Sequence, residues 1–271
     1  MKILEKIVKE ISSEQEKIIE YAHSHNRGVT TGIYNNIAKP LIHELTIGER
    51  IIPIISILKR NVYEEEGHDP DANPLIYAMK NVKDWRFKDP KRDIFRFFRR
   101  AIQIAKRTDL LKKSYDTLIK IPSKSELNNI LSDVLERLIL FKNPSISEYF
   151  VKIDINEMWE YINYNQIAKD CGGKNKKYEE KVEELKSCLD RQQTDLGATF
   201  SFKKLPNEYR KYIGKCFKQE DAQLDLSEFI NDCNILICDD TITTETSISR
   251  MCQCVCEFYI PKSITVVTLL S

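Results

Sequence analysis

One stretch near the carboxyl end of the 271-residue chain places an apolar strand, two acids and a run of hydroxyls in direct succession. Residues 235–238 are apolar and of strand type, and Asp239 and Asp240 follow at once. Five hydroxyl side chains come next: Thr241, Thr243, Thr244, Thr246 and Ser247. A helical pattern begins at about Ser247. Open α/β sheets form ligand sites from such strand–turn–helix units, at the carboxyl ends of their strands.

The chemistry of this stretch suits a sugar phosphate. The carboxylates of Asp239 and Asp240 can each accept a hydrogen bond from one of two vicinal sugar hydroxyls. Threonine hydroxyls and backbone N–H groups at a helix N-terminus suit a phosphate group. The alternative is an exposed acidic turn, because most acids are simply solvated. The ordered succession of strand, acids, hydroxyls and helix is rarer than an acid pair alone, and it favours a ligand site.

The stretch resembles the phosphoribosyl-pyrophosphate (PRPP) motif of type I phosphoribosyltransferases. That motif is a hydrophobic strand, two acids, a short spacer and Thr-Thr-Gly-x-Thr. The acid pair, the Thr-Thr pair and the last hydroxyl match at Asp239, Asp240, Thr243, Thr244 and Ser247. Glu245 stands where the family has glycine, which allows the backbone to approach the 5′-phosphate and to adopt positive φ. A glutamate brings a side chain and a like charge instead.

A second strand–turn–helix pattern covers residues 115–140. A strand ends at Pro122, a polar turn follows, and a helix begins at about Leu127 and runs to Leu140. The turn resembles the pyrophosphate-binding loop of the same family, which implies that Ser123, Lys124 and Ser125 hold the pyrophosphate of PRPP. The alternative interpretation is an ordinary polar turn between a strand and a helix.

Residues 205–217 resemble a segment of the ComF-like branch of this family, which reads Leu-x-x-x-x-Arg-x-x-Asn-x-x-x-x-Phe. Ile213 occupies the place of the asparagine, and Phe217 comes one position early. The branch's N-terminal four-cysteine zinc element is absent. In such enzymes basic residues of this segment close over the pyrophosphate, which makes candidates of Arg210, Lys211 and Lys215. These residues could equally be surface charges on a linker.

Together the resemblances imply a phosphoribosyltransferase-like protein that binds PRPP or a related ribose phosphate or nucleotide, and that transfers or cleaves at ribose C1. Mg²⁺ would bridge pyrophosphate and sugar oxygens, so Asp239 and Asp240 would contact the metal through the substrate. The acid pair would orient the ribose, with one acid acting in acid–base catalysis. The other expected substrate-binding residues are Ser123, Lys124, Ser125, Arg210, Lys211, Thr241, Thr243, Thr244, Thr246 and Ser247.

Two further functions fit the same residues. The first is a non-catalytic sensor or effector that binds a nucleotide or ribose phosphate. Glu245 and the absence of glycine after Gly214 favour it. Orphan members of this family occur in bacterial stress and phage-defence gene clusters, where the N-terminal helices could dock a partner protein or nucleoprotein. The second is a pure interaction protein with a silent pocket.

We predict an α/β fold with a mostly parallel sheet of phosphoribosyltransferase type and an N-terminal helical extension. Apolar residues recur at helical spacing over residues 2–26 and 33–63, and a boundary loop follows at 64–74. Residues 1–72 are therefore expected to form a helical segment that docks a partner or a second copy. Residues 73–271 would form the phosphoribosyltransferase-like domain, with 143–218 as a variable, mobile insertion.

Composition excludes several classes of function. The formal net charge of +1 gives no case for nucleic-acid binding by the whole chain. No apolar run reaches the length of a membrane span, and the N-terminus lacks the apolar core of a secretory signal. The eight cysteines are therefore expected to be reduced thiols in the cytoplasm. The aromatic and basic residues of 93–107 separate onto two faces of a helix, which predicts packing on a sheet.

Overall fold

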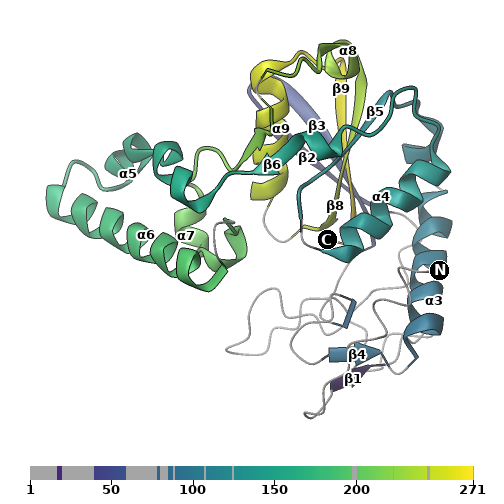
Figure 1. The fold of residues 1–271 in the computed structure, drawn as a ribbon, viewed down its shortest axis with the longest axis horizontal. Coiled ribbons are helices and arrows are strands. Elements are labelled where there is room, and N and C mark those ends of the chain that lie inside the picture. The colour runs from purple at the N-terminus through teal and green to yellow at the C-terminus, as the bar shows by residue number, and fades with distance from the viewer. Residues whose placement is uncertain are drawn as a thin grey trace.

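A five-stranded mixed sheet with helices on both faces organises the chain in the computed structural model (Figure 1). The structure describes residues 17–19, 40–58, 78–79, 85–87, 89–106, 108–123, 125–196, 200–221, 223–242 and 245–270. The strand order is β2-β3-β9-β8-β5, in which β2 is antiparallel to β3 and the other pairs are parallel. The strands are β2 (Leu41–Ile47), β3 (Arg50–Leu58), β5 (Thr117–Lys120), β8 (Asn234–Thr241) and β9 (Ser263–Leu270). This arrangement confirms the predicted α/β fold with a mostly parallel sheet.

The central strands β8 and β9 are apolar on both faces. Ile237 pairs with Val266 between them, and Leu236 pairs with Leu118 of β5. Near-continuous runs of β-branched and apolar residues are typical of parallel strands that are covered on both sides. Strand β8 was predicted from the apolar run at 235–238.

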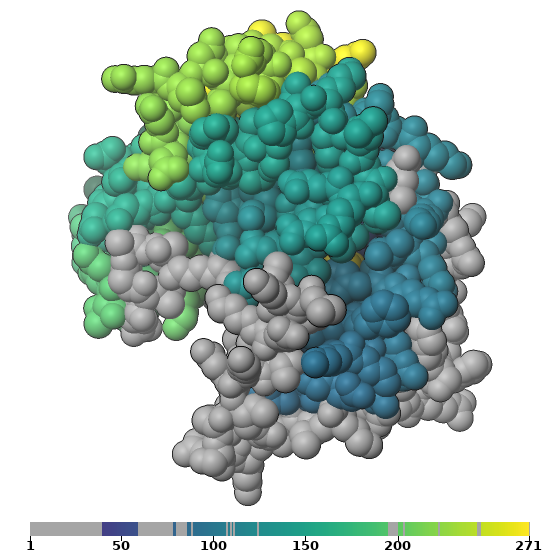
Figure 2. Space-filling model, turned by 45° about the vertical axis from the view of Figure 1, so that its right-hand side comes forward, coloured from purple at the N-terminus to yellow at the C-terminus, as the bar shows by residue number. Residues whose placement is uncertain are grey.

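Helices close the two faces of the sheet. On one face α9 (Thr246–Phe258) packs its buried residues into the same core as Ile235 and Ile237 of β8. On the other face α3 (Pro90–Ala105) and α4 (Glu126–Leu138) pack with Leu236 and Cys238. The surfaces of α3 and of the segment around α4 adjoin on one side of the molecule (Figure 2). The α3 helix confirms the prediction for the basic, aromatic segment, since Phe97 is fully buried.

Residues 150–219 form an arm that projects from the α9 side of the sheet (Figure 1). Its base is the antiparallel pair of β6 (Phe150–Lys152) and β7 (Phe217–Gln219). Between these strands lie η3 (Ile155–Tyr161), α5 (Tyr164–Asp170), α6 (Asn175–Leu196), η4 (Phe202–Lys204) and α7 (Asn207–Arg210). That residues 143–218 form a variable, mobile insertion stays a prediction. The remaining short elements are η1 (Asp109–Lys112), η2 (Ser147–Tyr149) and α8 (Ser227–Ile230).

The helical prediction for the N-terminal segment is wrong over the described strands. Residues 41–58 form the β2–β3 hairpin, and β1 (Lys17–Ile19) pairs in parallel with β4 (Trp85–Phe87). Residues 50–58 are a short, almost continuous apolar run, and periodicity alone cannot separate a buried strand from a helix in such a run. Strands from both sides of residue 72 share the central sheet, so the sheet extends beyond 73–271. The rest of 1–72 lies outside the described residues, and its docking role stays a prediction.

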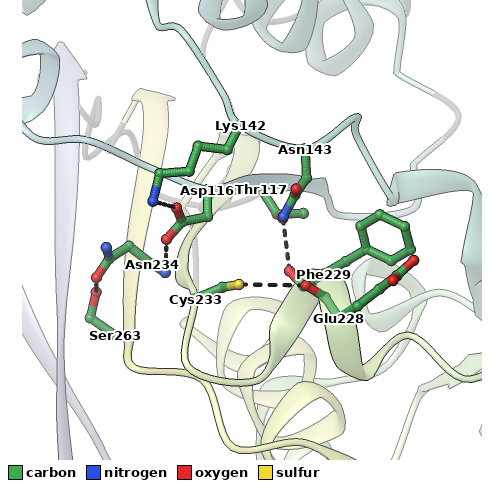
Figure 3. A network of polar contacts seen from close by, with 9 residues as sticks. All are labelled: Asp116, Thr117, Lys142, Asn143, Glu228, Phe229, Cys233, Asn234 and Ser263. Atoms are coloured by element: carbon green, nitrogen blue, oxygen red, sulfur yellow. Dashed lines mark hydrogen bonds and ion pairs between the residues drawn. The ribbon is translucent and has the colours of Figure 1, made fainter.

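A polar network ties together the N-terminal ends of β5, β8 and β9 (Figure 3). Asp116 accepts a hydrogen bond of 2.7 Å from the Asn234 N–H and forms an ion pair with Lys142. The Ser263 hydroxyl donates to Asn234 Oδ1 at 2.8 Å. Burial acts to raise the pKa of Asp116, but the Asn234 N–H and Lys142 outweigh it and lower the pKa. Asp116 is therefore held as a carboxylate in a nearly buried position.

Candidate functional site

Strand β8 continues through the acid pair. It ends at Thr241, three residues beyond Cys238, the last residue of the apolar run. Asp239 pairs with Thr268 of β9, and Thr241 pairs with Leu270. The two acids are therefore part of the last strand residues, and the turn to α9 begins only after them. This agrees with the expectation of a strand that ends in acids and is followed by a turn and a helix.

The two carboxylates lie on opposite sides of the strand. Successive strand residues point to opposite faces of a sheet, and this places Asp239 on the α9 side and Asp240 on the α4 side. Asp240 is 4% exposed, whereas Asp239 is half-buried. Thr241 Oγ1 donates to Asp240 Oδ1 at 2.8 Å. A ligand on one face of the sheet thus meets one of the carboxylates, and a ligand that reaches both must lie across the strand end.

The turn after β5 lies directly beside the end of β8. The Ile121 N–H donates to Cys238 O at 3.0 Å, which continues the ladder between the two strands up to the acid pair. The Ser125 N–H donates to Ser123 Oγ at 3.2 Å, and Ser125 then begins α4 as its N-cap. Both predicted ligand turns therefore meet at one edge of the sheet. Lys124, Thr243 and Thr244 lie outside the described residues.

The chain leaves β5 and β8 toward opposite faces of the sheet. The buried leucines of α4 belong to the core on one face, and the buried residues of α9 belong to the core on the other. Two adjacent parallel strands whose following helices diverge in this way mark the topological switch point of an open α/β sheet. Ligands bind outside the carboxyl ends of the strands at such a point.

Two buried oxygens at the start of α4 have no hydrogen-bond partner among the described residues. They are Ser125 Oγ and Asn128 Oδ1. Asn128 is fully buried, and its Nδ2 donates to Ile121 O at 2.8 Å, which fixes the side chain against the turn. The Lys120 ammonium lies nearby and donates to Asn129 Oδ1 at 2.7 Å. Sequence reasoning missed Asn128 and Lys120, and the available signal was a polar residue among the apolar positions of a helix and of a strand.

The backbone at Glu245 has an ordinary conformation. Its φ is −59°, and its carbonyl accepts from the Ser249 N–H at 2.8 Å, so it caps α9. The positive φ that glycine allows is therefore not required here. Glu245 is exposed, and Thr246 and Ser247 form the first turn of α9, one residue earlier than the predicted start.

The structure does not bring the three predicted cations of the 205–217 segment to the acid pair. Lys211 forms an ion pair with Asp170, and the hydrogen bonds from Lys211 and Tyr212 lower the pKa of Asp170 to about 2. Lys215 is 2.8 Å from Glu257 in the last turn of α9. That turn lies about 16 Å along the helix from the first one. Lys215 is thus at the C-terminal end of α9, whereas the acid pair precedes its N-terminal end.

Arg210 is held within the arm. Its Nε donates to Leu205 O at 2.9 Å, and Figure 1 shows α7 beside α6 and away from the ends of β5 and β8. The resemblance placed these cations over a pyrophosphate, but the segment that carries them packs as part of the arm. A side chain's position depends on tertiary packing that a motif in the sequence does not encode.

Comparison of the chain with models of known protein families, with curated proteins and with solved structures found no match. Within the described residues, no three or more His, Cys, Asp or Glu side chains gather as a metal-binding group. None of the described helices is long and apolar enough to cross a membrane.

Proposed function

We propose that the edge of the sheet formed by the ends of β5 and β8 binds a ribose phosphate such as PRPP, in a protein of phosphoribosyltransferase type that acts in the cytoplasm. One observation carries this proposal: two adjacent parallel strands, each followed by a hydroxyl-containing turn and a helix, send their helices to opposite faces of the sheet. A ligand at this edge is offered two helix N-termini, and each of them favours an anionic group.

The two turns are proposed to divide the ligand between them. Ser123, Ser125 and the first turn of α4 would hold the pyrophosphate. The Ser125 hydroxyl, which has no hydrogen-bond partner among the described residues, would donate to it. Thr246, Ser247 and the first turn of α9 would hold the 5′-phosphate. The ribose would lie between these groups, across the end of β8, where a sugar hydroxyl can donate to a carboxylate of the acid pair.

The oxygens at this edge fit Mg²⁺. Carboxylates with hydroxyl or amide oxygens are hard ligands, and Mg²⁺ is usually bound by one or two carboxylates together with phosphates of the substrate. Asp239 and Asp240 would hold such an ion through the ligand, with Ser125 Oγ and Asn128 Oδ1 as further acceptors. When bound, Mg²⁺ would neutralise charge on the pyrophosphate. The residues of the chain position the sugar and the phosphates around it.

A specific observation favours a sensor over an enzyme as the second candidate. Departure of pyrophosphate requires positive charge at the leaving group. The three cations expected for that task are engaged elsewhere: Arg210 and Lys211 within the arm, and Lys215 with Glu257. Binding without turnover would leave the ligand intact as a signal, which matches a nucleotide- or PRPP-sensing effector.

The test is calorimetric titration with PRPP in the presence and absence of Mg²⁺. We expect Mg²⁺-dependent binding by the wild type and at least a tenfold loss in the Asp239→Asn/Asp240→Asn double variant, because the carboxylates accept from the sugar. Asp190→Asn, at an exposed position of α6, is the matched control and should bind like the wild type. Unchanged affinity in the double variant, with the fold intact by circular dichroism, would remove the proposed site.

The single variants of Asp239 and Asp240 test on which face of the sheet the ligand lies, because the two side chains point to opposite faces. If the ligand lies mainly on one face of the sheet, either Asp239→Asn or Asp240→Asn alone should account for most of the loss. Measurement of pyrophosphate release with candidate acceptor bases then separates the two functions. Release that requires the acid pair indicates an enzyme, whereas binding without release indicates a sensor.

A further inference from the structure

A second cavity lies at the other end of the same strands. It has a volume of about 560 Å³ and adjoins the N-terminal ends of β8 and β9 and the first half of β3. Its lining residues are Arg50, Ile51, Ile52, Pro53, Lys113, Ser114, Tyr115, Asn234, Lys262, Ser263, Ile264 and Thr265. The size is within the range of about 300–1,000 Å³ that is typical of small-molecule sites. Because Asp239 and Asp240 are at the opposite end of β8, this cavity is separate from the site proposed above.

The cavity is strongly cationic. Arg50, Lys113 and Lys262 all line it, and the described lining contains no Asp or Glu. Arg50 Nη1 donates to Pro261 O at 2.7 Å, which anchors the guanidinium beside the turn that precedes β9. Lys113 and Lys262 are exposed, and neither forms an ion pair with a described acid. Three positive charges without a compensating acid favour an anionic ligand.

The floor of the cavity is apolar. Ile51 and Pro53 line it from the face of β3 opposite to that of Ile52, and Ile51 is 65% exposed. The Tyr115 side chain is 2% exposed and lies beside the Thr265 side chain. Burial raises the pKa of Tyr115, although the nearby Thr265 side chain acts against it, so the phenol stays protonated.

The wall of the cavity is fixed by the polar network shown in Figure 3. Asn234 and Ser263 line the cavity and are joined by their side chains at 2.8 Å. Asp116 follows Tyr115 in the chain, but its charge is compensated by Lys142 and by the Asn234 N–H. The nearby acid therefore does not cancel the positive charge at the rim. A polar wall that is already ordered reduces the entropy lost when a ligand binds.

We propose that this cavity binds a small phosphomonoester with an apolar or aromatic body. A phosphomonoester carries about −1.5 to −2 charges at pH 7, which matches three cations better than a single carboxylate does. The phosphoryl group would lie at the rim between Arg50, Lys113 and Lys262. The apolar body would cover Ile51 and Pro53 on the floor.

The test uses 1-naphthyl phosphate as the probe and two compounds that each lack half of it. Inorganic phosphate supplies the charge without the ring, and 1-naphthol supplies the ring without the charge. We expect the probe to bind at least tenfold more tightly than either, with an affinity that falls as salt is added. Equal affinity for 1-naphthol would show that the cations take no part, and it would overturn the proposal.

Charge reversal locates the binding. Lys113→Glu and Lys262→Glu should each weaken binding of 1-naphthyl phosphate at least tenfold, and both positions are exposed, so the fold should tolerate the change. Lys177→Glu, at an exposed position of α6, makes the same change of net charge elsewhere and should bind like the wild type. Loss of affinity in Lys177→Glu that equals the loss in Lys262→Glu would show non-specific attraction and contradict the site.

The two proposed sites can fail independently. The probe contains no ribose, and its binding should survive in the Asp239→Asn/Asp240→Asn variant, whereas PRPP binding should survive in Lys262→Glu. Chemical acylation of lysines read by mass spectrometry gives a second measurement, in which the probe should protect Lys113 and Lys262 but not Lys177. If Lys113 and Lys262 are acylated equally with and without a saturating concentration of the probe, the proposed location is wrong.

Discussion

At Glu245 the structure separates the effect of charge from that of backbone geometry. The residue has φ −59°, which every amino acid adopts readily, so glycine would gain nothing there from positive φ. The remaining difference is the carboxylate itself, which is exposed at the N-terminus of α9. A bound 5′-phosphate at that terminus would be repelled by the carboxylate.

Replacement of Glu245 should therefore strengthen PRPP binding through charge alone. We expect Glu245→Gln and Glu245→Gly to raise the affinity by similar factors, roughly 3- to 10-fold, in low-salt calorimetry. The glutamine variant should lose up to about 1 kcal/mol of stability, because an acid near a helix N-terminus is favourable. A higher affinity for PRPP in Glu245→Gly but not in Glu245→Gln would show that the size of the side chain, and not its charge, limits phosphate binding.

Among the elements, the base of the arm contains a glycine in close contact with backbone. The Gly214 N–H donates to Tyr161 O at 2.7 Å, and a Cβ added to Gly214 would lie 2.9 Å from the same oxygen. Gly214 is not among the glycines with positive φ. Its small size, and not its conformational freedom, is therefore what the structure requires.

The sign of the effect of Gly214→Ala tests this contact. Without a clash, the substitution should stabilise the protein by about 0.4–1 kcal/mol, because it restricts the unfolded chain. With the clash we expect a loss of about 1–3 kcal/mol, as in other overpacked positions. Urea unfolding of the wild type and of Gly214→Ala gives the change in the free energy of unfolding. Gly173→Ala, which has open space but φ +76°, is the control for backbone strain alone.

The elements that sequence reasoning identified correctly share a clear signal. The units from β5 to α4 and from β8 to α9 each combine a short apolar strand, a polar turn and an amphipathic helix, and each part supports the assignment of the next. The β2–β3 hairpin lacks such support. Its apolar run fits either a strand or a helix, and only pairing with β9, more than 200 residues away, decides between them.

The directions of the acids could not be derived from the sequence. A shift of one residue in the pairing register of a strand moves every side chain to the other face, and the register is not known from the sequence. The sequence predicted a strand that ends in the two acids, but not the face on which each carboxylate lies; in the structure they are on opposite faces. Asn128 was missed for a related reason, because its role depends on the turn that it packs against.

At the scale of the whole molecule, both proposed sites depend on one sheet. Strand β8 has Asp239 and Asp240 near its carboxyl end and Asn234, in the wall of the cationic cavity, at its start. The network around Asp116 holds the starts of β5, β8 and β9 together (Figure 3). Loss of this network should lower the stability of the whole sheet.

Acid should reveal the contribution of Asp116. The pKa of Asp116 is lowered in the folded protein, so its stabilising effect is complete above the unfolded value of about 3.9 and disappears as the pH falls through the folded value. We expect Asp116→Asn to lose about 1–3 kcal/mol of stability at pH 7, because the charge-assisted bond to the Asn234 N–H is weakened. Urea unfolding at pH 7, 5 and 3 should show this difference between variant and wild type shrinking only at pH 3. Lys142→Met, which keeps the Asn234 bond, should lose much less, since Lys142 is largely exposed. A difference that is the same at all three pH values would mean that the Asp116 charge does not stabilise the sheet.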